Sequence, residues 1–298
     1  MRCYLELFKY IPEHIEVCWN YLLHNRDSFE CNLAIITKVK NEAPYILEWI
    51  EYHKLIGVER FVIYDNESDD NLQEVLAPYI RSGEVIYRFF EGNIFQSEDK
   101  FYTDSIREYR NRFKWIALID IDEFIVPLRK KNIMEEFDEI RKTIKKKPFT
   151  SLCINWVMYG YSGYYSKQEG LVMENYTKSD GVAVQVKSII NPRTVIQFRV
   201  HFAIHFFDLK GYNEKGNPVF RGMKSFSPQL DATVDYMRIN HYYTKSYEEH
   251  KQKIMRFNKL WNLPSVFPEF DPEYLSHYND MVMTPFLPEL KKALQIIE

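Results

Sequence analysis

The sequence lacks the features of disulfide-rich, membrane-spanning and nucleic-acid-binding chains. Its four cysteines, Cys3, Cys18, Cys31 and Cys153, are scattered and form no CxxC pair. This spacing argues against a structural zinc site and is typical of reduced thiols in a cytosol. No apolar run approaches the length of a membrane span, and the first twenty residues lack the apolar core of a signal peptide. A net charge of −3 gives no reason to expect nucleic-acid binding. We therefore expect a cytoplasmic chain with no nucleic-acid partner.

What is present is an ordinary globular composition with many aromatic residues. The chain has 298 residues, of which 46% are hydrophobic and 27% are charged, enough for one large domain or two small ones. Its 22 Tyr, 21 Phe and 5 Trp could build stacking surfaces, but composition alone favours a large aromatic core.

From residue 32 onward, strand-like and helix-like segments alternate. Strands are predicted by the short apolar runs at 33–37, 61–64, 84–88 and 115–119. Apolar residues at spacings of four, three and four predict the helices between them; the first begins near Pro44 and ends at Gly57, and the last extends to Phe113. This alternation predicts βαβ crossovers, and hence an α/β fold with a mixed, mainly parallel sheet flanked by helices.

The second half of the chain has a different pattern. A helix is predicted at 131–147, with a basic outer face that includes Lys145, Lys146 and Lys147. Such a face is ordinarily exposed to solvent, and contact with anionic lipids is the more specific alternative. Segments 151–157, 182–190 and 194–206 are β-like. The chain becomes helical again from residue 246, where one helical face carries Tyr247, His250, Ile254, Phe257 and Trp261. We divide the chain into an N-terminal extension (1–31), a main domain (32–245) and a helical C-terminal segment (246–298).

Polar residues gather where three predicted strands end. They are Thr37, Asn41 and Glu42 after the first strand, Asp65 and Asn66 after the second, and Asp120 and Asp122 after 115–119. In an open parallel α/β sheet, ligands bind beyond the carboxyl ends of the strands. We therefore expect these side chains to share one binding edge.

Asp120 and Asp122 are the strongest candidates for chemistry. Residues two apart on an extended chain point to the same side, so both carboxylates are expected to converge while Ile121 turns into the core. Two convergent carboxylates need a cation, and hard oxygen ligands suit Mg²⁺ or Mn²⁺, which keep positions open for phosphate oxygens. His241 could complete such a site. Lys187 is either an edge charge or a partner of a diphosphate.

The acidic pair has other possible interpretations. An EF-hand loop needs glycine at its sixth position, where Ile125 stands, so this interpretation is discarded. A haloacid-dehalogenase-like phosphohydrolase would use Asp120 as nucleophile, but there the acidic pair normally follows the first strand, whereas here it follows the fourth. A DxD motif alone is weak, and a solvated strand end remains an alternative.

Three blocks of the sequence together resemble a known family. They are KNEAPYILEWIEYHKLIGVERFVIYDNESDD (40–70), WIALIDIDEF (115–124) and INHYYTKSYEEHKQK (239–253). Taken in this order, they resemble glycosyltransferase family 92 and its bacterial, family-2-like relatives, over most of 32–253. The resemblance implies a GT-A fold, a UDP-sugar donor and a divalent metal, commonly Mn²⁺.

The resemblance also implies roles for the residues at the predicted binding edge. Thr37 and Asp65 would lie against the uracil and ribose of the donor, with Asn41, Glu42 and Asn66 in the same donor-binding region. Asp120 and Asp122 would bind the ribose and the metal–diphosphate, Asp122 more directly. His241 is similar to a late metal-binding histidine, and Lys187 falls in the family's KSI block.

The acceptor side is less defined. The family is taken to invert at the anomeric carbon, which requires a carboxylate base after the DxD motif. Candidates are Glu169, Glu174 and Asp208, and the sequence does not choose among them. Both His201 and His205 match a downstream family histidine, so neither is assigned a role. The aromatic segment 156–166 is either an acceptor platform or a loop over the core.

The function implied is transfer of a hexose, with galactose as first choice, from a UDP-sugar to a glycan or lipid-linked acceptor in surface polysaccharide synthesis. Such an enzyme would work in the cytoplasm, with peripheral contact at the inner face of the membrane. Alternatives are the phosphohydrolase described above and a non-catalytic, sugar-nucleotide-binding scaffold subunit. The acceptor, the linkage and the oligomeric state stay open.

Overall fold

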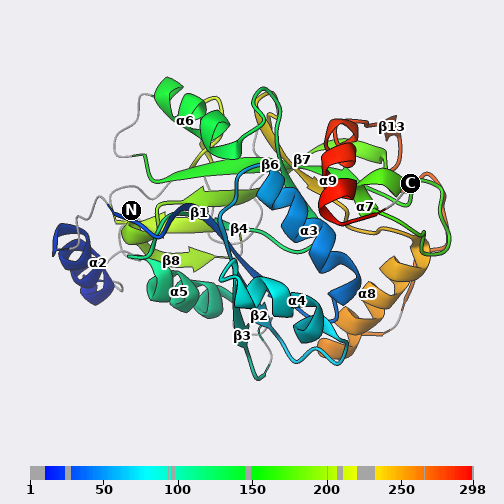
Figure 1. Cartoon of the computed structure of the whole chain (residues 1–298), viewed down its shortest axis with the longest axis horizontal. Coiled ribbons are helices and arrows are strands. Elements are labelled where there is room, and N and C mark those ends of the chain that lie inside the picture. Colours follow the sequence, from blue (N-terminus) through cyan, green and yellow to red (C-terminus); the bar gives the residue numbers. More distant parts are fainter. Residues whose placement is uncertain are drawn as a thin grey trace.

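A mixed sheet runs through the protein. The computed structural model describes residues 11–23, 28–92, 94, 98–144, 149–199, 201–206, 211–219, 232–264 and 266–296. Within these residues, the sheet follows the strand order β11-β10-β6-β7-β4-β1-β2-β3, and β5, β12 and β13 join it off this path (Figure 1). The α/β fold class predicted from the sequence, a mixed sheet flanked by helices, is confirmed.

The N-terminal half of the sheet is parallel and is built from βαβ units. Its strands are β1 (Cys31–Val39), β2 (Arg60–Asp65), β3 (Val85–Phe89) and β4 (Phe113–Leu118). The helices between them are α3 (Ala43–Leu55), α4 (Leu72–Arg81) and α5 (Glu98–Tyr109). Each strand and helix predicted here is present. One boundary was wrong: α5 ends at Tyr109, and Phe113 begins β4, where its buried ring stacks on that of Tyr109.

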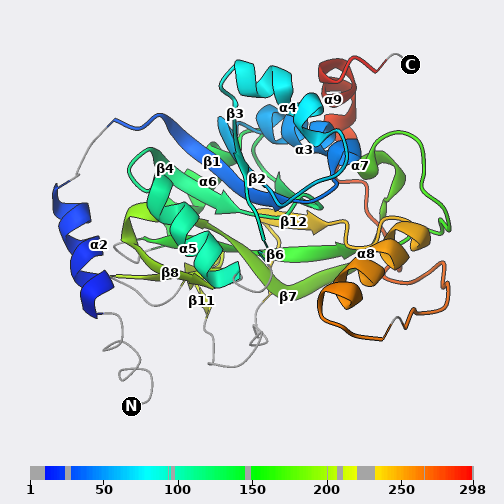
Figure 2. The same cartoon turned by 90° about the horizontal axis from the view of Figure 1, so that it is seen from below.

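Alternation along the strands divides the core between the two faces of the sheet. Leu33 and Ile35 of β1 pack on the same side as α3, α4 and α6 (Ile133–Thr143). Ala34 and Ile36 pack on the opposite side, against α5 and a small hairpin. Figure 2 shows α3 and α4 on one side of the sheet and α5 on the other. Each buried Leu or Ile contributes about 1.5–3 kcal/mol of transfer free energy, so this alternation holds both layers in place.

The remaining strands pair mainly antiparallel, although β6 pairs in parallel with both β10 and β12. The strands are β5 (Glu123–Pro127), β6 (Ser151–Tyr159), β7 (Lys178–Ile190), β8 (Val195–Arg199), β9 (Phe202–His205), β10 (Gly211–Tyr212), β11 (Pro218–Val219), β12 (Met237–His241) and β13 (Tyr278–Asn279). The other helices are α2 (Ile11–Leu23), α7 (Val172–Asn175), η3 (Pro192–Thr194), α8 (Tyr247–Leu260), η4 (Thr284–Phe286) and α9 (Leu287–Ala293). The β-like segment 194–206 is the hairpin β8–β9 rather than one strand.

The C-terminal segment is helical only in parts. Between α8 and η4 the chain is mostly irregular, and β13 pairs with β7 of the main sheet. Leu290 of α9 is fully buried in the core beside α3, so this segment contributes to the main hydrophobic core. The proposed division at residues 31 and 245 stays a prediction.

Two expectations fall outside the described residues. Lys145, Lys146 and Lys147 of the basic helix lie there, and α6 ends at Thr143. Asp208 also lies there. Among the residues that the structure describes, no helix is both long and apolar enough to cross a membrane.

Candidate active site

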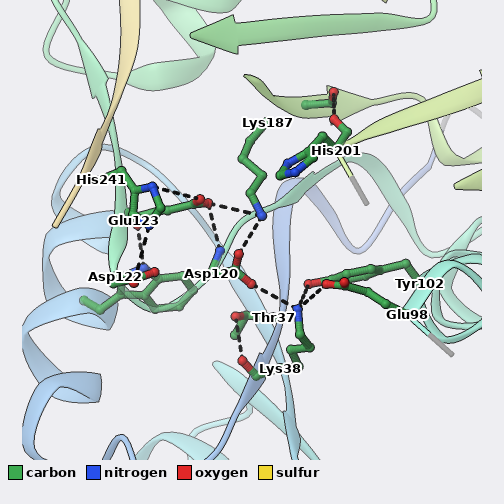
Figure 3. Close-up of polar contacts among 12 residues, drawn as sticks. Thr37, Lys38, Glu98, Tyr102, Asp120, Asp122, Glu123, Lys187, His201 and His241 are labelled. Carbon is green, nitrogen blue, oxygen red and sulfur yellow. Dashed lines mark hydrogen bonds and ion pairs between the residues drawn. The ribbon is translucent and has the colours of Figure 1, made fainter. Parts of the chain in front are cut away.

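Strand register brings the predicted residues to one edge of the sheet. Leu118, the last residue of β4, lies beside Ile36 of the parallel strand β1 and beside Ser188 of the antiparallel strand β7. The next two residues of the chain therefore lead Asp120 towards Lys38 on one side and Lys187 on the other. Figure 3 shows these side chains meeting.

The segment 120–123 is a turn, not the extended strand that the sequence analysis assumed. The Glu123 amide donates to the Asp120 carbonyl (3.1 Å), and the Glu123 carboxylate accepts from the Asp120 amide (3.0 Å). These reciprocal bonds close the turn and give the two aspartates separate partners. The expected cause of convergence, side-chain alternation on a strand, was therefore wrong, although both aspartates do lie at the predicted edge.

Asp120 lies between two lysines. Its carboxylate accepts a hydrogen bond from Lys187 Nζ at 2.6 Å and another from Lys38 Nζ at 3.3 Å. Lys38 in turn contacts Glu98 and the Tyr102 hydroxyl of α5. Burial opposes ionisation of Asp120, but the two ammonium groups hold its pKa well below the usual range. The group is therefore a carboxylate at neutral pH.

Asp122 faces the other side of the turn. Its Oδ2 accepts from Lys253 Nζ of α8 at 2.6 Å and lies 3.4 Å from His241 Nε2 of β12. Burial opposes ionisation here too, yet Lys253 and His241 hold the pKa of Asp122 well below its ordinary value. Burial lowers the pKa of His241 despite the adjacent carboxylate, which favours the neutral, metal-ligating imidazole.

Glu123 is the third acidic residue of the turn 120–123, and together with Asp120 and Asp122 it forms an acidic cluster. Its side chain is fully buried. Burial raises the pKa of Glu123 to about 8, and Lys187 Nζ lies 3.6 Å from its Oε2. Burial therefore opposes ionisation of Glu123, whereas the neighbouring cations keep both aspartates ionised. This difference explains how three carboxyl groups are accommodated within four residues.

Asp122 and His241 have the donor chemistry of a divalent-ion site. A carboxylate oxygen and an imidazole nitrogen 3.4 Å apart suit Mn²⁺, with positions left for water or phosphate oxygens. His241 Nδ1 is buried and has no hydrogen-bond partner among the described residues. Within those residues, no group of three or more His, Cys, Asp or Glu side chains gathers to hold an ion. The Asp122–His241 pair therefore fits a metal that substrate oxygens complete, and metal ligation by Asp120 stays a prediction.

The predicted donor-binding residues form a second group, where the loops after β1 and β2 are hydrogen-bonded together. Asn41 adopts a left-handed backbone (φ 59°); its amide donates to Ser68 Oγ, and its Oδ1 accepts from the Asp69 amide, both at 2.9 Å. Asp65 accepts from the Ser68 amide (2.9 Å) and from the Tyr87 hydroxyl (2.6 Å). These bonds fix the shape of the rim.

Three further members of that group are buried or partly buried beside it. Asn66 Nδ2 donates to the carbonyls of Phe90 and Gly92, and Thr37 is fully buried. Glu42 precedes α3, and burial raises the pKa of its carboxyl. The structure assigns local contacts to these residues, and their role in donor binding stays a prediction.

Glu169 and Glu174, the two general-base candidates among the described residues, make no described contact with the acidic cluster. Glu174 of α7 forms an ion pair with Lys291 of α9 at 2.9 Å, and Glu169 lies on an exposed loop. No hydrogen bond or ion pair among the described residues joins either one to Asp120 or Asp122. Their catalytic role stays a prediction.

The aromatic segment 156–166 was predicted to be either an acceptor platform or a loop over the core, and its residues differ in this respect. Tyr159 and Tyr161 are buried, and the Tyr161 hydroxyl hydrogen-bonds His250 Nδ1 (2.7 Å), so for these two the core interpretation is right. Trp156 instead lies at the acidic cluster, edge-on to His241 with ring centroids 4.4 Å apart.

His201 and His205, which both match the family histidine, differ in whether they contact Trp156. The His201 ring lies 5.4 Å from that of Trp156, whereas His205 is fully buried and hydrogen-bonds Thr194 (2.8 Å). Of the two, His201 is at the site.

Two members of the site, Lys38 and Lys253, were not predicted from the sequence, and neither Glu123 nor Trp156 was assigned a role of its own. Both lysines carried a usable signal. Lys38 directly follows the predicted strand 33–37, at the expected binding edge, and Lys253 lies three residues after His250, one helical turn along a face predicted to be shared.

This edge of the sheet, with its ionised DxD turn, lysines and histidine, has the charge chemistry that suits an anionic ligand together with a cation. Residues 33–280 match glycosyltransferase family 92, and the chain belongs to that family. A family 92 protein of Oryza sativa subsp. japonica is 29% identical over 222 residues, covering 74% of this chain and 35% of the rice protein. The galactan beta-1,4-galactosyltransferase GALS3 of Arabidopsis thaliana is 31% identical over 119 residues, covering 36% of this chain and 23% of that protein.

The chain spans about a third of the length of the first curated relatives it matches (35%, 32% and 37%). Among solved structures, it is similar to S. aureus TarS 1–349 in complex with UDP, with 12% identity and a TM-score of 0.37 over 54% of this chain and 47% of that one.

Proposed function

We propose that this protein is a metal-dependent, inverting glycosyltransferase that moves a hexose from a UDP-sugar to a glycan or lipid-linked acceptor in surface polysaccharide synthesis. Galactose is the first choice of sugar, supported by the similarity to galactan galactosyltransferases of Arabidopsis thaliana. The proposed location is cytoplasmic, with peripheral contact at the inner face of the membrane.

The observation that carries this proposal is the arrangement of cations around the DxD turn. Lys38, Lys187 and Lys253 each place an ammonium group within 3.3 Å of an Asp120 or Asp122 oxygen. A diphosphate brings charge that needs compensation, and lysine ammonium groups act as point charges towards phosphate. The cluster thus suits a nucleoside diphosphate better than a neutral ligand.

Two residues, Asp122 and His241, would hold the divalent ion. The ion, when bound, would supply Lewis-acid stabilisation of the charge that develops on the leaving diphosphate. Lys187 lies at the same place with its ammonium buried against Asp120, where low dielectric strengthens its interaction with developing negative charge. The acceptor hydroxyl must lose a proton to a carboxylate on the opposite face, for which Glu169, Glu174 and Asp208 remain the candidates.

A donor screen tests the proposal. Purified protein with Mn²⁺ or Mg²⁺ would be incubated with UDP-galactose, UDP-glucose or UDP-N-acetylhexosamines, and UDP release measured. We expect slow hydrolysis of one donor, and a UDP-induced rise in melting temperature only with metal present. If UDP raised the melting temperature as much in excess chelator as with metal present, UDP binding would not require the metal.

Two outcomes would favour the alternatives. Release of phosphate from small esters would indicate a phosphohydrolase with Asp120 as nucleophile. Binding of UDP-sugars without hydrolysis or transfer, across many acceptors, would indicate a scaffold subunit.

A further inference from the structure

The two halves of α8 differ in their surroundings. In the first half, Tyr247 and His250 are buried, and Lys253 reaches the Asp122 carboxylate. In the second half, the spacing predicts that Phe257 and Trp261 continue the same face, but both are exposed, and Asn258 is the one buried residue among the described residues 254–260. Figures 1 and 2 show α8 at the end of the molecule opposite α2.

Large apolar side chains remain exposed where α8 ends and in the loop that follows. They are Met255 (48% exposed), Phe257 (53%), Trp261 (44%), Leu263 (50%) and Val266 (73%). The rings of Phe257 and Trp261 lie 6.3 Å apart and so form a pair at the surface. Five exposed apolar residues within twelve positions, two of them paired through their rings, are a denser set than the single exposed apolar residues of most proteins.

Basic residues are interleaved with these apolar ones. Between residues 250 and 268 the sequence has Lys251, Lys253, Arg256 and Lys259 and no acidic residue. Arg256 and Lys259 are exposed, and among the described residues neither forms a salt bridge. Tryptophan and phenylalanine that alternate with lysine and arginine on an exposed helix are typical of segments that lie in the interface of a membrane.

This composition favours a lipid surface over a protein partner. Protein–protein interfaces are depleted in lysine, whereas an anionic membrane attracts it and accepts the neighbouring apolar side chains between its headgroups. We infer that the end of α8 and the loop after it, meaning here the described residues of 255–266 (255–264 and 266), form a membrane-docking surface for anionic phospholipid. The basic helix predicted at 131–147 was the first candidate for such contact, and the exposed aromatic residues of α8 favour a different segment.

The docking surface lies on the same helix as the site. Lys253, whose Nζ is 2.6 Å from Asp122 Oδ2, is only two residues before Met255. Docking through residues 255–266 would therefore bring the DxD edge close to the headgroup layer, where a lipid-linked acceptor presents its polar end. This consequence rests on the proposed function; the docking itself does not.

The test is co-sedimentation of the full chain with vesicles of phosphatidylcholine alone or with added phosphatidylglycerol. We expect binding only to the anionic vesicles, weakened by salt. Phe257→Ala with Trp261→Ala should reduce the partition coefficient at least about tenfold. Arg256→Gln and Lys259→Gln should each reduce it roughly fivefold.

Matched controls lie elsewhere on the surface. Phe89→Ala removes an exposed aromatic ring of β3, and Arg141→Gln with Lys142→Gln removes exposed charges of α6. These controls should leave partitioning unchanged. Loss of binding in the α6 variant but not in the α8 variants would overturn the inference.

Two other results would also overturn the inference. One is equal binding to neutral and anionic vesicles. The other is concentration-dependent self-association that Trp261→Ala abolishes without any vesicle binding by the wild type, since residues 255–266 would then be a protein interface. Donor hydrolysis without vesicles is measured in parallel and should be unchanged in the α8 variants. Vesicle binding without hydrolysis in any variant would therefore reject the proposed function while leaving the docking surface in place.

Discussion

Lys253 occupies the place next to Asp122 where a divalent ion would sit, so replacing it should change metal affinity. Its Nζ lies 2.6 Å from Asp122 Oδ2 and 3.0 Å from the Tyr243 carbonyl. A metal that binds Asp122 and His241 must compete with this ammonium group. Lys253→Met keeps much of the side-chain stem and removes the charge.

The size of the effect follows from the ion pair. A hydrogen bond to a charged group contributes about 1.5–3 kcal/mol net. Because the Lys253 side chain is 38% exposed while that of Asp122 is 12% exposed, solvent screens the pair and we take the lower end. About 1.5 kcal/mol corresponds to roughly tenfold. We expect Lys253→Met to bind Mn²⁺ about tenfold more tightly than the wild type.

The assay is Mn²⁺ binding by calorimetry or by loss of the free-ion electron paramagnetic resonance signal, without nucleotide. Without metal, the variant should melt at a lower temperature, because Asp122 loses its closest cation, and Mn²⁺ should raise its melting temperature more than it raises that of the wild type. Lys251→Met, two residues away on α8 and exposed, serves as the control. Mn²⁺ affinity of Lys253→Met equal to or weaker than that of the wild type would show that the lysine does not compete with metal.

Three further predictions follow from other contacts. Asp122→Asn should reduce donor hydrolysis at least about a hundredfold, with Asp120→Asn similar and both proteins folded by circular dichroism; wild-type rates in folded variants would exclude these carboxylates from the reaction. Burial lowers the pKa of His53 to about 3, so the folded protein cannot take up the proton that the unfolded chain binds below about pH 6.5. Stability should therefore fall by about 2 kcal/mol per such histidine between pH 7.5 and 5, and urea unfolding of His53→Gln should show a flatter pH dependence; an unchanged slope would contradict the assignment. Gly160→Ala would place a Cβ 1.8 Å from the Tyr274 carbonyl oxygen, and overpacking of this kind costs about 1–3 kcal/mol or more; thermal unfolding within a degree of the wild type would show that the 274–276 segment moves away freely.

The parallel half of the sheet was predictable because its signals are local. The apolar runs at 33–37 and 61–64 and the helical spacing after Pro44 each depend on neighbours within one turn or one strand. The DxD motif after 115–119 could be placed at the carboxyl edge for the same reason, since strands joined by βαβ crossovers run parallel and their carboxyl ends lie at one edge of the sheet. Phe113 shows where this reasoning ends: its position suits a helix face, and only its burial in the sheet makes it part of β4.

Local pattern could not determine how the two aspartates are held. Whether residues 120–122 are extended or turned depends on Glu123, which is anchored where β5 pairs with β12, with His241 opposite it. That pairing joins residues more than a hundred positions apart, and no periodicity in the sequence encodes it.

The sequence by itself therefore determined the α/β class, the edge of the sheet that carries the site, and the acidic residues at its centre. Tertiary structure alone decided which cations meet them: Lys187 through the register of β7 on β4, and Lys253 through the packing of α8, 131 residues from Asp122. It also decided that Phe257 and Trp261 stay exposed while Tyr247 and His250, on the same helix, are buried. The physical reason is that spacing along a chain specifies which side chains share a face, whereas the environment of that face depends on distant segments.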